Sequence, residues 1–169
     1  MPSFHDQFVQ LFEGSFRRLD RYLNRLTGDP DLASDIAQEA LVSLYRRGSL
    51  PDAPEAWLIS VAMNRLRNVA STRSRRLRLL TPARGDRAHA DPPPAPDEAA
   101  AAEDSRRQVR VALEKLPERD RQLLLLHAEG YGYRDMALAL KLHSGSIGVF
   151  LARARRAFRA AYEETFGAP

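Results

Sequence analysis

The chain has 169 residues, of which 44% are hydrophobic and 28% are charged, and it contains no cysteine. This length suits one ordinary domain or two small ones, and the lack of cysteine excludes a disulfide scaffold, a thiolate zinc site and a cysteine nucleophile. The first residues do not show the basic and apolar segments of a secretory signal, and no apolar run approaches the roughly 20 residues that cross a bilayer. We therefore expect a soluble, cytoplasmic protein with no membrane insertion.

The net charge is +4, and arginine supplies all but two of the 26 basic residues. Two segments, 64–84 and 141–159, are rich in arginine and contain no acid, whereas residues 81–104 are acidic overall. Codon bias in a GC-rich genome explains the arginine excess as well as nucleic-acid binding does, but it does not explain the clustering. Acid-free basic segments favour a polyanionic partner over an ordinary solvated helix face, which normally mixes both signs.

Apolar residues before residue 81 recur at helical spacing. A first helix is expected from about Ser3, with an apolar stripe from Phe4 to Leu26 and an end at residues 27–30. A second helix is expected over 31–47 with Gly48 as its stop, and a third helix is expected to begin near residue 55. The inward residues of these two helices should be Leu32, Ile36, Ala40, Leu44, Trp57, Leu58, Val61 and Ala62.

Residues 81–104 are rich in proline, alanine and acid and are nearly empty of large apolar side chains, which is typical of a flexible linker. The part of this segment from residue 97 can equally belong to the next helix. Four further helices are expected, over 109–116, 118–129, 133–142 and 144 to about 165. The predicted fold is therefore all-α, with two small helical domains, 1–80 and 105–166, joined by the linker 81–104.

Residues 133–142, a tight turn and residues 144–159 have the proportions of a DNA-binding helix-turn-helix. Within the second helix the inward residues should be Ile147, Leu151, Ala154 and Phe158. Its first residues would then read base edges in the major groove, and its arginines would hold phosphates. The residues expected at the DNA are Ser144, Ser146, Gly148, Val149, Arg153, Arg155 and Arg156. An arginine-rich helical hairpin without DNA is the alternative that shape alone leaves open.

Five sequence blocks occur in a fixed order: 21–27 (RYLNRLT), 31–39 (DLASDIAQE), 56–64 (AWLISVAMN), 116–122 (LPERDRQ) and 145–156 (GSIGVFLARARR). In these blocks the chain resembles a small sigma factor of bacterial RNA polymerase, of the extracytoplasmic-function (ECF) group. The resemblance covers nearly everything outside the linker. It implies that residues 1–80 form the sigma-2 domain and residues 105–166 the sigma-4 domain.

The resemblance also implies partners and site residues. Asp35, Gln38 and Glu39 would dock on the clamp helices of the largest polymerase subunit, and the sigma-4 domain would contact the flap. Loop 48–54 and the helix after it would capture an unstacked base of the promoter −10 element, with Asn64 at a base edge. The arginines that would hold the −10 backbone are Arg65, Arg67, Arg73, Arg75 and Arg76. An anti-sigma factor is the further partner that the resemblance implies.

Some residues depart from the family pattern. Leu138, Lys141, Val149 and Phe150 replace residues that are usually polar, glycine or aliphatic, and a left-handed backbone at Lys141 would cost about 1 kcal/mol. His143 is a poor helix cap unless Ser144 takes over. These departures leave open an alternative, in which a sigma-like regulatory protein binds a signalling partner and not promoter DNA. A stand-alone helix-turn-helix repressor fits less well because the first half of the chain is long.

Sites for catalysis are not evident in the sequence. The four histidines lack paired metal-ligand spacing, and neither a phosphate-binding Gly-Lys-Ser/Thr loop nor a dinucleotide fingerprint occurs. Asp29 and Asp31 flank Pro30 at a predicted helix start, where acids stabilise the helix dipole, so we do not interpret them as metal ligands. The prediction is a protein that is not an enzyme, with no catalytic residue, metal or cofactor.

Overall fold

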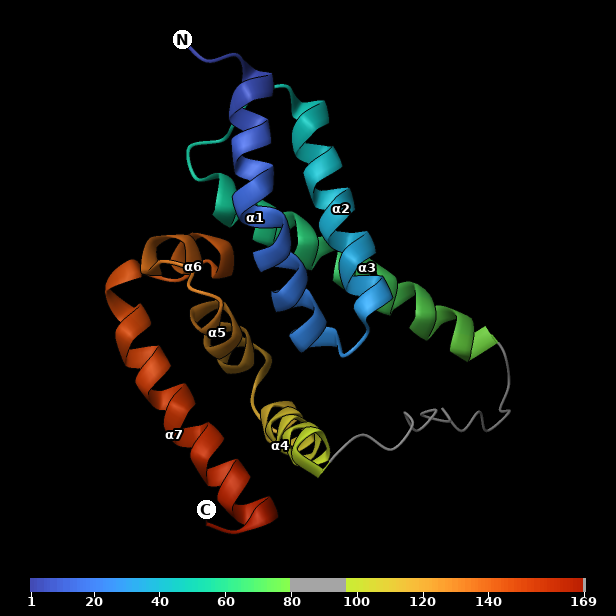
Figure 1. The fold of residues 1–169 in the computed structure, drawn as a ribbon, viewed down its shortest axis with the longest axis vertical. Helices are drawn as coiled ribbons and strands as arrows, with labels where there is room; N and C mark the ends of the chain where they lie inside the picture. The colour runs from blue at the N-terminus through green and yellow to red at the C-terminus, as the bar shows by residue number, and fades with distance from the viewer. Residues whose placement is uncertain (80–96, 169) are drawn as a thin grey trace.

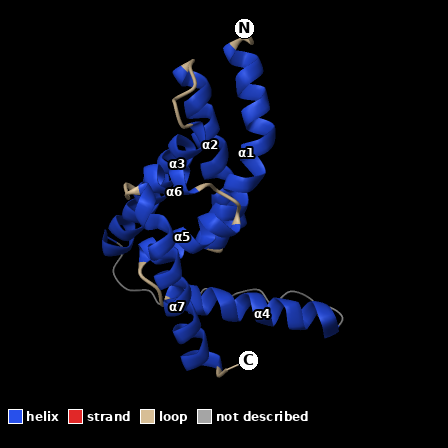
Figure 2. Ribbon diagram, turned by 90° about the vertical axis from the view of Figure 1, so that its left-hand side faces the viewer, coloured by secondary structure: helices blue, strands red, loops and turns tan. Residues whose placement is uncertain are grey.

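The computed structural model describes residues 1–79 and 97–168, with side chains at 1–73 and 99–168. Within these ranges the chain is helical and contains no strand, which confirms the predicted all-α fold (Figure 2). The helices are α1 (Phe4–Thr27), α2 (Pro30–Arg47), α3 (Pro54–Leu79), α4 (Asp97–Glu114), α5 (Glu118–Ala128), α6 (Tyr133–Leu140) and α7 (Ile147–Phe166), with a short 3-10 turn at Ser144–Ser146 before α7.

The ends of α1 and α2 follow from local sequence signals. At the start of α1, the Ser3 side chain accepts a hydrogen bond from the Asp6 amide, and the Asp6 carboxylate accepts from the Ser3 amide, which is a capping box. The Ser3 hydroxyl also donates to the Asp6 carboxylate at 2.7 Å, and this hydrogen bond, followed by the one from the Ser3 amide, lowers the pKa of Asp6. The Leu32 amide donates to the Asp29 carboxylate at 3.1 Å, so Asp29 caps α2. Gly48 ends α2 in the left-handed conformation with φ 75°, as predicted.

Helices α1, α2 and α3 form the first domain, in which α1 and α2 run side by side and α3 packs against both (Figure 1). Tyr22, Leu23, Leu44 and Ile59 are fully buried in its core. Burial raises the pKa of the Tyr22 phenol, whose hydroxyl donates to the Met63 sulfur at 3.5 Å. Most of the predicted inward positions of α2 and α3 are confirmed as buried, whereas Leu32, Trp57 and Val61 are half-buried against the same core.

Helices α4 to α7 form the second domain. The Tyr162 hydroxyl on α7 donates to the Gln108 side chain on α4 at 2.8 Å, and the Lys115 ammonium donates to Thr165 at 2.7 Å. Helix α4 begins at Asp97, 12 residues before residue 109, which confirms the alternative that residues 97–104 of the expected linker belong to this helix. The physical reason is a run of alanines behind two acids, since alanine has the highest helix propensity and acids favour the first turn. The flexible linker predicted over residues 81–96 lies outside the described residues.

The two domains pack against each other. Helix α5 lies against α1, and α6 lies against α3, so the buried side chains of both domains form one connected cluster. Figure 1 shows α5 and α6 beside the lower half of α1. The sequence predicted two bundles and a linker, but it gave no indication of this contact.

Candidate nucleic-acid interface

The outward face of α2 carries Asp35, Gln38 and Glu39, all exposed. They share one face because they are spaced three to four residues apart, while Ile36 and Ala37 between them are buried. The resulting stripe offers carboxylates that accept hydrogen bonds and an amide that both accepts and donates them, which suits the docking of a partner helix that carries arginines. Its place on the outside of α2 fits the predicted polymerase contact, which stays a prediction.

Arg65 of α3 contacts this same stripe. Its guanidinium donates to the Glu39 carboxylate at 2.8 Å and to the Ser43 hydroxyl at 3.0 Å. The sequence assigned Glu39 to the polymerase and Arg65 to DNA, so the structure brings together two residues predicted for different partners. Both side chains are about half exposed, so the pair contributes no more than about 1 kcal/mol and can be exchanged for another partner.

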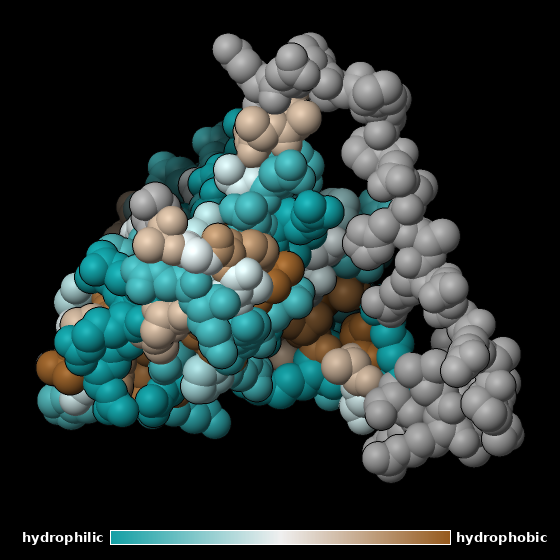
Figure 3. All heavy atoms as spheres, turned by 90° about the horizontal axis from the view of Figure 1, so that it is seen from below, coloured by the Kyte–Doolittle hydropathy of each residue, from teal (hydrophilic) through white to brown (hydrophobic). Residues whose placement is uncertain are grey.

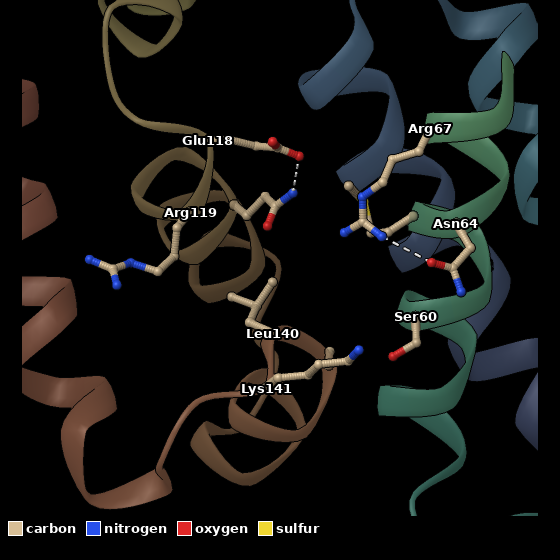
Figure 4. A pocket seen from close by; sticks show the side chains of 10 residues that line it. Ser60, Asn64, Arg67, Glu118, Arg119, Leu140 and Lys141 are labelled. Carbon is tan, nitrogen blue, oxygen red and sulfur yellow. Dashed lines mark hydrogen bonds between the residues drawn. The ribbon is translucent and has the colours of Figure 1, made fainter. Parts of the chain in front are cut away.

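The other described −10 candidates lie farther along α3. Asn64 and Arg67 are exposed, and the Arg67 guanidinium donates to the Asn64 carbonyl at 2.9 Å. The Arg73 guanidinium lies 3.9 Å from the Asp29 carboxylate. Figure 4 shows Asn64 and Arg67 on the side of α3 that faces the second domain. The side chains of Arg75 and Arg76 lie outside the described residues, so their predicted DNA contacts are not placed.

The turn between α6 and α7 contains the predicted left-handed residue. Lys141 has φ 56° and ψ 46° and is the one residue other than glycine with positive φ in the described chain. The prediction that His143 is a poor cap is wrong. Its ring nitrogen Nδ1 accepts a hydrogen bond from the Gly145 amide at 3.2 Å, because the extended backbone at His143 points the imidazole back over the turn. The Ser146 side chain, in contrast, makes no cap at the start of α7.

The periodicity of α7 is confirmed by burial. Ile147, Leu151 and Ala154 are fully buried, and Phe158 is half-buried against the core. The predicted DNA residues lie on the other side of the helix and its preceding turn, with Ser146 half-buried and the remainder exposed: Ser144, Gly148, Val149, Arg153, Arg155 and Arg156. Val149 is 61% exposed, so an apolar side chain stands where the helix would enter a groove.

Two residues beside this surface were missed from the sequence. Tyr133, at the start of α6, is 46% exposed, and a Cβ added at Gly148 would lie 3.8 Å from its ring. His127 lies next to it, with 6.3 Å between the ring centroids, and the Arg155 guanidinium is 3.5 Å from His127 Nδ1. The first helix of a helix-turn-helix crosses the DNA backbone. Tyr133 lies at the start of that helix, so the motif alone could have predicted its position beside DNA.

The four residues that depart from the family pattern, Leu138, Lys141, Val149 and Phe150, differ in their exposure and in their neighbours. Phe150 is half-buried, and the Arg119 guanidinium lies 4.6 Å from its ring centroid, so Phe150 packs within the domain. Leu138 and Val149 are exposed. Lys141 lines a cavity of about 320 Å³ between the two domains, together with Asn64 and Arg67 (Figure 4).

A second hollow, of about 740 Å³, lies between the end of α1 and the helices α4, α5 and α7. Its apolar walls are Val109, Leu113, Leu124, Leu125 and Phe158. Figure 3, which views the molecule from below, shows hydrophobic atoms set back between hydrophilic ones on this side. Across the described residues, no group of three or more acidic or histidine side chains could hold a metal ion, and none of the described helices is long and apolar enough to cross a membrane.

Comparison with known proteins gives two family matches. The profile of Sigma-70 region 2 matches residues 11–76, and the profile of Sigma-70 region 4 matches residues 106–158. The chain is also 32% identical over 141 residues to the probable RNA polymerase sigma factor RfaY of Xanthomonas campestris pv. campestris. That match covers 79% of this chain but 35% of the relative, so the chain spans about a third of the relative's length.

Among solved structures, the chain is similar to the sigma factor RpoE of Bartonella quintana, which was crystallised with the anti-sigma factor NepR. The TM-score is 0.65 at 20% identity, over 93% of this chain and 97% of that one, so the likeness shows a shared fold. One helical domain matches region 2 and the other matches region 4, so the chain belongs to the sigma-70 family. Its assignment to the ECF group stays the resemblance that the five sequence blocks carry.

Proposed function

We propose that this chain is a promoter-specificity subunit of bacterial RNA polymerase, which brings the core enzyme to particular promoters and helps to open the −10 DNA. The observation that carries this proposal is the occurrence of both sigma regions in one chain, each with its own basic helix. The name of the Xanthomonas relative, a probable RNA polymerase sigma factor, supports the same function. A sigma subunit acts in the cytoplasm, where we place the protein.

Core polymerase would bind the acidic stripe of α2. Asp35, Gln38 and Glu39 are exposed together, and they can accept and donate hydrogen bonds to arginine and polar side chains on a partner helix. The clamp helices of the largest subunit are the proposed partner, with the flap as the partner of the second domain. The pair between Glu39 and Arg65 would then open when polymerase binds, which releases Arg65 toward DNA.

The −10 element would be opened along α3. Flipping a base out of a duplex costs a few kcal/mol, which contacts to the flipped base and to the backbone must offset. The loop before α3 and Asn64 would hold the base, while Arg65, Arg67 and Arg73 would hold phosphates. Arg75 and Arg76 are proposed for the same role on their position in the basic segment alone.

The −35 element would be read as duplex by α7. Gly148 lets the backbone come close to the bases, and the exposed Val149 suits contact with a thymine methyl group better than a hydrogen bond. Arg153, Arg155 and Arg156 would hold phosphates and fix the register. We expect a −35 preference in which thymine matters at the position facing Val149.

We also propose that an anti-sigma protein regulates this chain. The support is the Bartonella structure, in which a protein of the same fold is bound to NepR. Such a partner would clamp the two domains or wedge between them. The alternative, in which the chain binds a signalling partner and no promoter, is favoured by exposed Leu138, and it predicts no transcription.

Run-off transcription tests the function. Purified core polymerase is incubated with fragmented genomic DNA, with and without the protein, and transcript starts are mapped. Discrete new transcripts that share upstream elements would support the proposal and reveal the promoter. Co-elution with core but no transcript would favour the regulatory alternative, and failure of both would contradict a role in transcription.

A further inference from the structure

The contact between the two domains is centred on one buried acid. Glu129 follows the end of α5, and its side chain is 3% exposed. On α1, the Arg21 Nε donates to one carboxylate oxygen of Glu129 at 2.9 Å, and an Arg25 nitrogen lies 2.9 Å from the other oxygen as an ion pair. Arg21 and Arg25 stand one helical turn apart, so both can reach one carboxylate. Among the side chains that the structure describes, Glu129 is the one charged group that is less than a tenth exposed.

Further contacts surround this acid on the same side of α1. The Arg18 guanidinium lies 4.3 Å from the ring centroid of Tyr131 and 2.6 Å from the Glu55 carboxylate. Burial raises the pKa of the Tyr131 phenol, which therefore stays neutral. At the end of α1, the Arg110 side chain of α4 covers Gly28, where an added Cβ would meet the guanidinium at 3.8 Å. The contacts of Arg18 with Tyr131 and of Arg110 with Gly28 join the first domain to the second, whereas Glu55 holds Arg18 in place from within the first domain.

The far side of the contact is less favourable. There α6 packs on α3, and the 320 Å³ cavity between them is lined by Arg67 from one domain and Lys141 from the other. Among the described residues, Arg119 also lines this cavity and Glu118 is its one acid, so the lining holds three cations, from both domains, and one acid (Figure 4). The like charges of Arg67 and Lys141 repel each other across this part of the domain contact. The electrostatic attraction between the two domains therefore comes from the side with Glu129. The same contact holds α6 in front of Asn64 and Arg67, two of the proposed −10 residues.

This packed arrangement cannot span a promoter. Elements centred about 10 and 35 base pairs upstream are about 85 Å apart on straight duplex, at 3.4 Å per base pair. A compact domain of this size has a radius of gyration of about 11 Å, so two touching domains fall far short. The segment 80–96 has 17 residues and can reach at most about 60 Å, which permits a wide separation of the domains.

We propose that the packed arrangement is an autoinhibited state, and that Glu129 with Arg21 and Arg25 is the latch that holds it closed. Core polymerase would favour the open state because the two domains can occupy separate sites only when they part. Naming polymerase and promoter as the agents that open the chain rests on the proposed function, whereas the latch itself does not. Because both arginines are half exposed, added salt should weaken the latch.

A distance measurement on the full chain tests the latch. The sequence has no cysteine, so Q10C on α1 and A160C on α7, both at exposed positions, can carry a donor and an acceptor dye. In this background we compare E129Q, the double variant R21Q/R25Q and, as a matched control, R17Q on the same helix. Arg17 is exposed and takes no part in the described domain contact.

Both latch variants should raise the ratio of open to closed molecules about tenfold, which corresponds to about 1.4 kcal/mol. Their combination should open the chain no further, because both remove the same interaction. R17Q should leave the ratio unchanged. An E129Q ratio equal to that of R17Q would overturn the latch. If E129Q disturbs folding, the test rests on comparing the ratio of R21Q/R25Q with that of R17Q. Arg21 and Arg25 are half exposed, so their replacement leaves the core intact.

Adding core polymerase separates the latch from the proposed function. The dye distance needs neither polymerase nor DNA, so an open E129Q supports the latch whatever polymerase does. If core polymerase then leaves the wild-type distance unchanged, the proposed function is contradicted and the latch stands. If core polymerase opens the wild type while E129Q and R21Q/R25Q match R17Q, the function stands and the latch is overturned.

Discussion

The basic residues of α3 and those of α7 look alike in the sequence but differ in the structure. On α3, Arg65 is paired with Glu39, Arg67 with Asn64 and Arg73 with Asp29. On α7, the described structure shows no acid within ion-pair distance of the predicted DNA arginines. The helix proposed to read duplex DNA, α7, therefore has arginines without an acidic partner among the described residues, whereas α3, the helix proposed to open the strands, must exchange partners within the protein for DNA.

The largest expected effect comes from α7. Replacing Arg153, Arg155 and Arg156 by alanine should flatten the salt dependence of promoter-duplex binding by about 2.7 in log–log slope, at about 0.9 for each phosphate contact. Affinity at low salt should fall at least tenfold. The matched control is R17A/R106A/R107A, which removes three exposed arginines elsewhere. Fluorescence anisotropy over a salt series measures both the slope and the affinity at low salt. Equal slopes for the two triple variants would refute phosphate contacts by α7.

A smaller effect in the opposite direction is expected on α3. E39Q frees Arg65, so the protein alone should bind single-stranded −10 DNA up to about fivefold more tightly, because an exposed pair is worth up to about 1 kcal/mol. The exposed Glu13 of α1 supplies the control E13Q with the same charge change. If E39Q and E13Q gain equally, the improvement is a net-charge effect and the paired-arginine comparison fails.

The end of α6 differs from the ends of α1, α2 and α7. Those three helices end with a glycine at positive φ (Gly28, Gly48 and Gly167), whereas α6 ends with Lys141 at φ 56°. K141G should raise the free energy of unfolding by about 0.5 to 1 kcal/mol, since a side chain is strained in this region. Urea unfolding followed by circular dichroism measures it. Unchanged stability would mean that contacts of the lysine stem offset the strain.

The smallest effect is a pH dependence confined to the first domain. Hydrogen bonds from Ser3 hold the pKa of Asp6 below its ordinary value of 3.8, so the capping box stabilises α1 above that pH and is lost as the pH falls through the lowered pKa. Amide exchange at the start of α1 should therefore rise in acid, and S3A should remove the change. Helix α7, whose cap is not a carboxylate, should show none. An S3A protein with the wild-type pH response would contradict this account of the cap.

Local features were predictable from the sequence. Asp29 and Gly48 mark helix ends because capping and left-handed glycine act within one turn, and Ile147 and Leu151 showed the buried face of α7 by spacing alone. The start of α4 was left open between residues 97 and 109 because alanine and acids next to prolines resemble a linker as much as a helix, and the structure confirms Asp97. The cap made by His143 required the backbone angles of the turn.

Side-chain pairs between residues far apart in the chain could not be predicted from the sequence. Arg65 and Glu39 are 26 residues apart, and Arg21 and Glu129 are 108 apart, so each pair depends on how helices cross. The sequence placed Asp35, Gln38 and Glu39 on one exposed face, since helical spacing decides that. It could not show that Glu39 and Arg65 share a contact, or that α6 faces Asn64.

The most direct test of the account is the state of the −10 DNA in the complete complex. Permanganate oxidises unpaired thymines, so a promoter found by run-off transcription is treated with core polymerase, with this protein, and with both. The account predicts reactive thymines around −10 with both proteins together and none with either alone. Core polymerase that is recruited to the promoter while these thymines stay protected would contradict it.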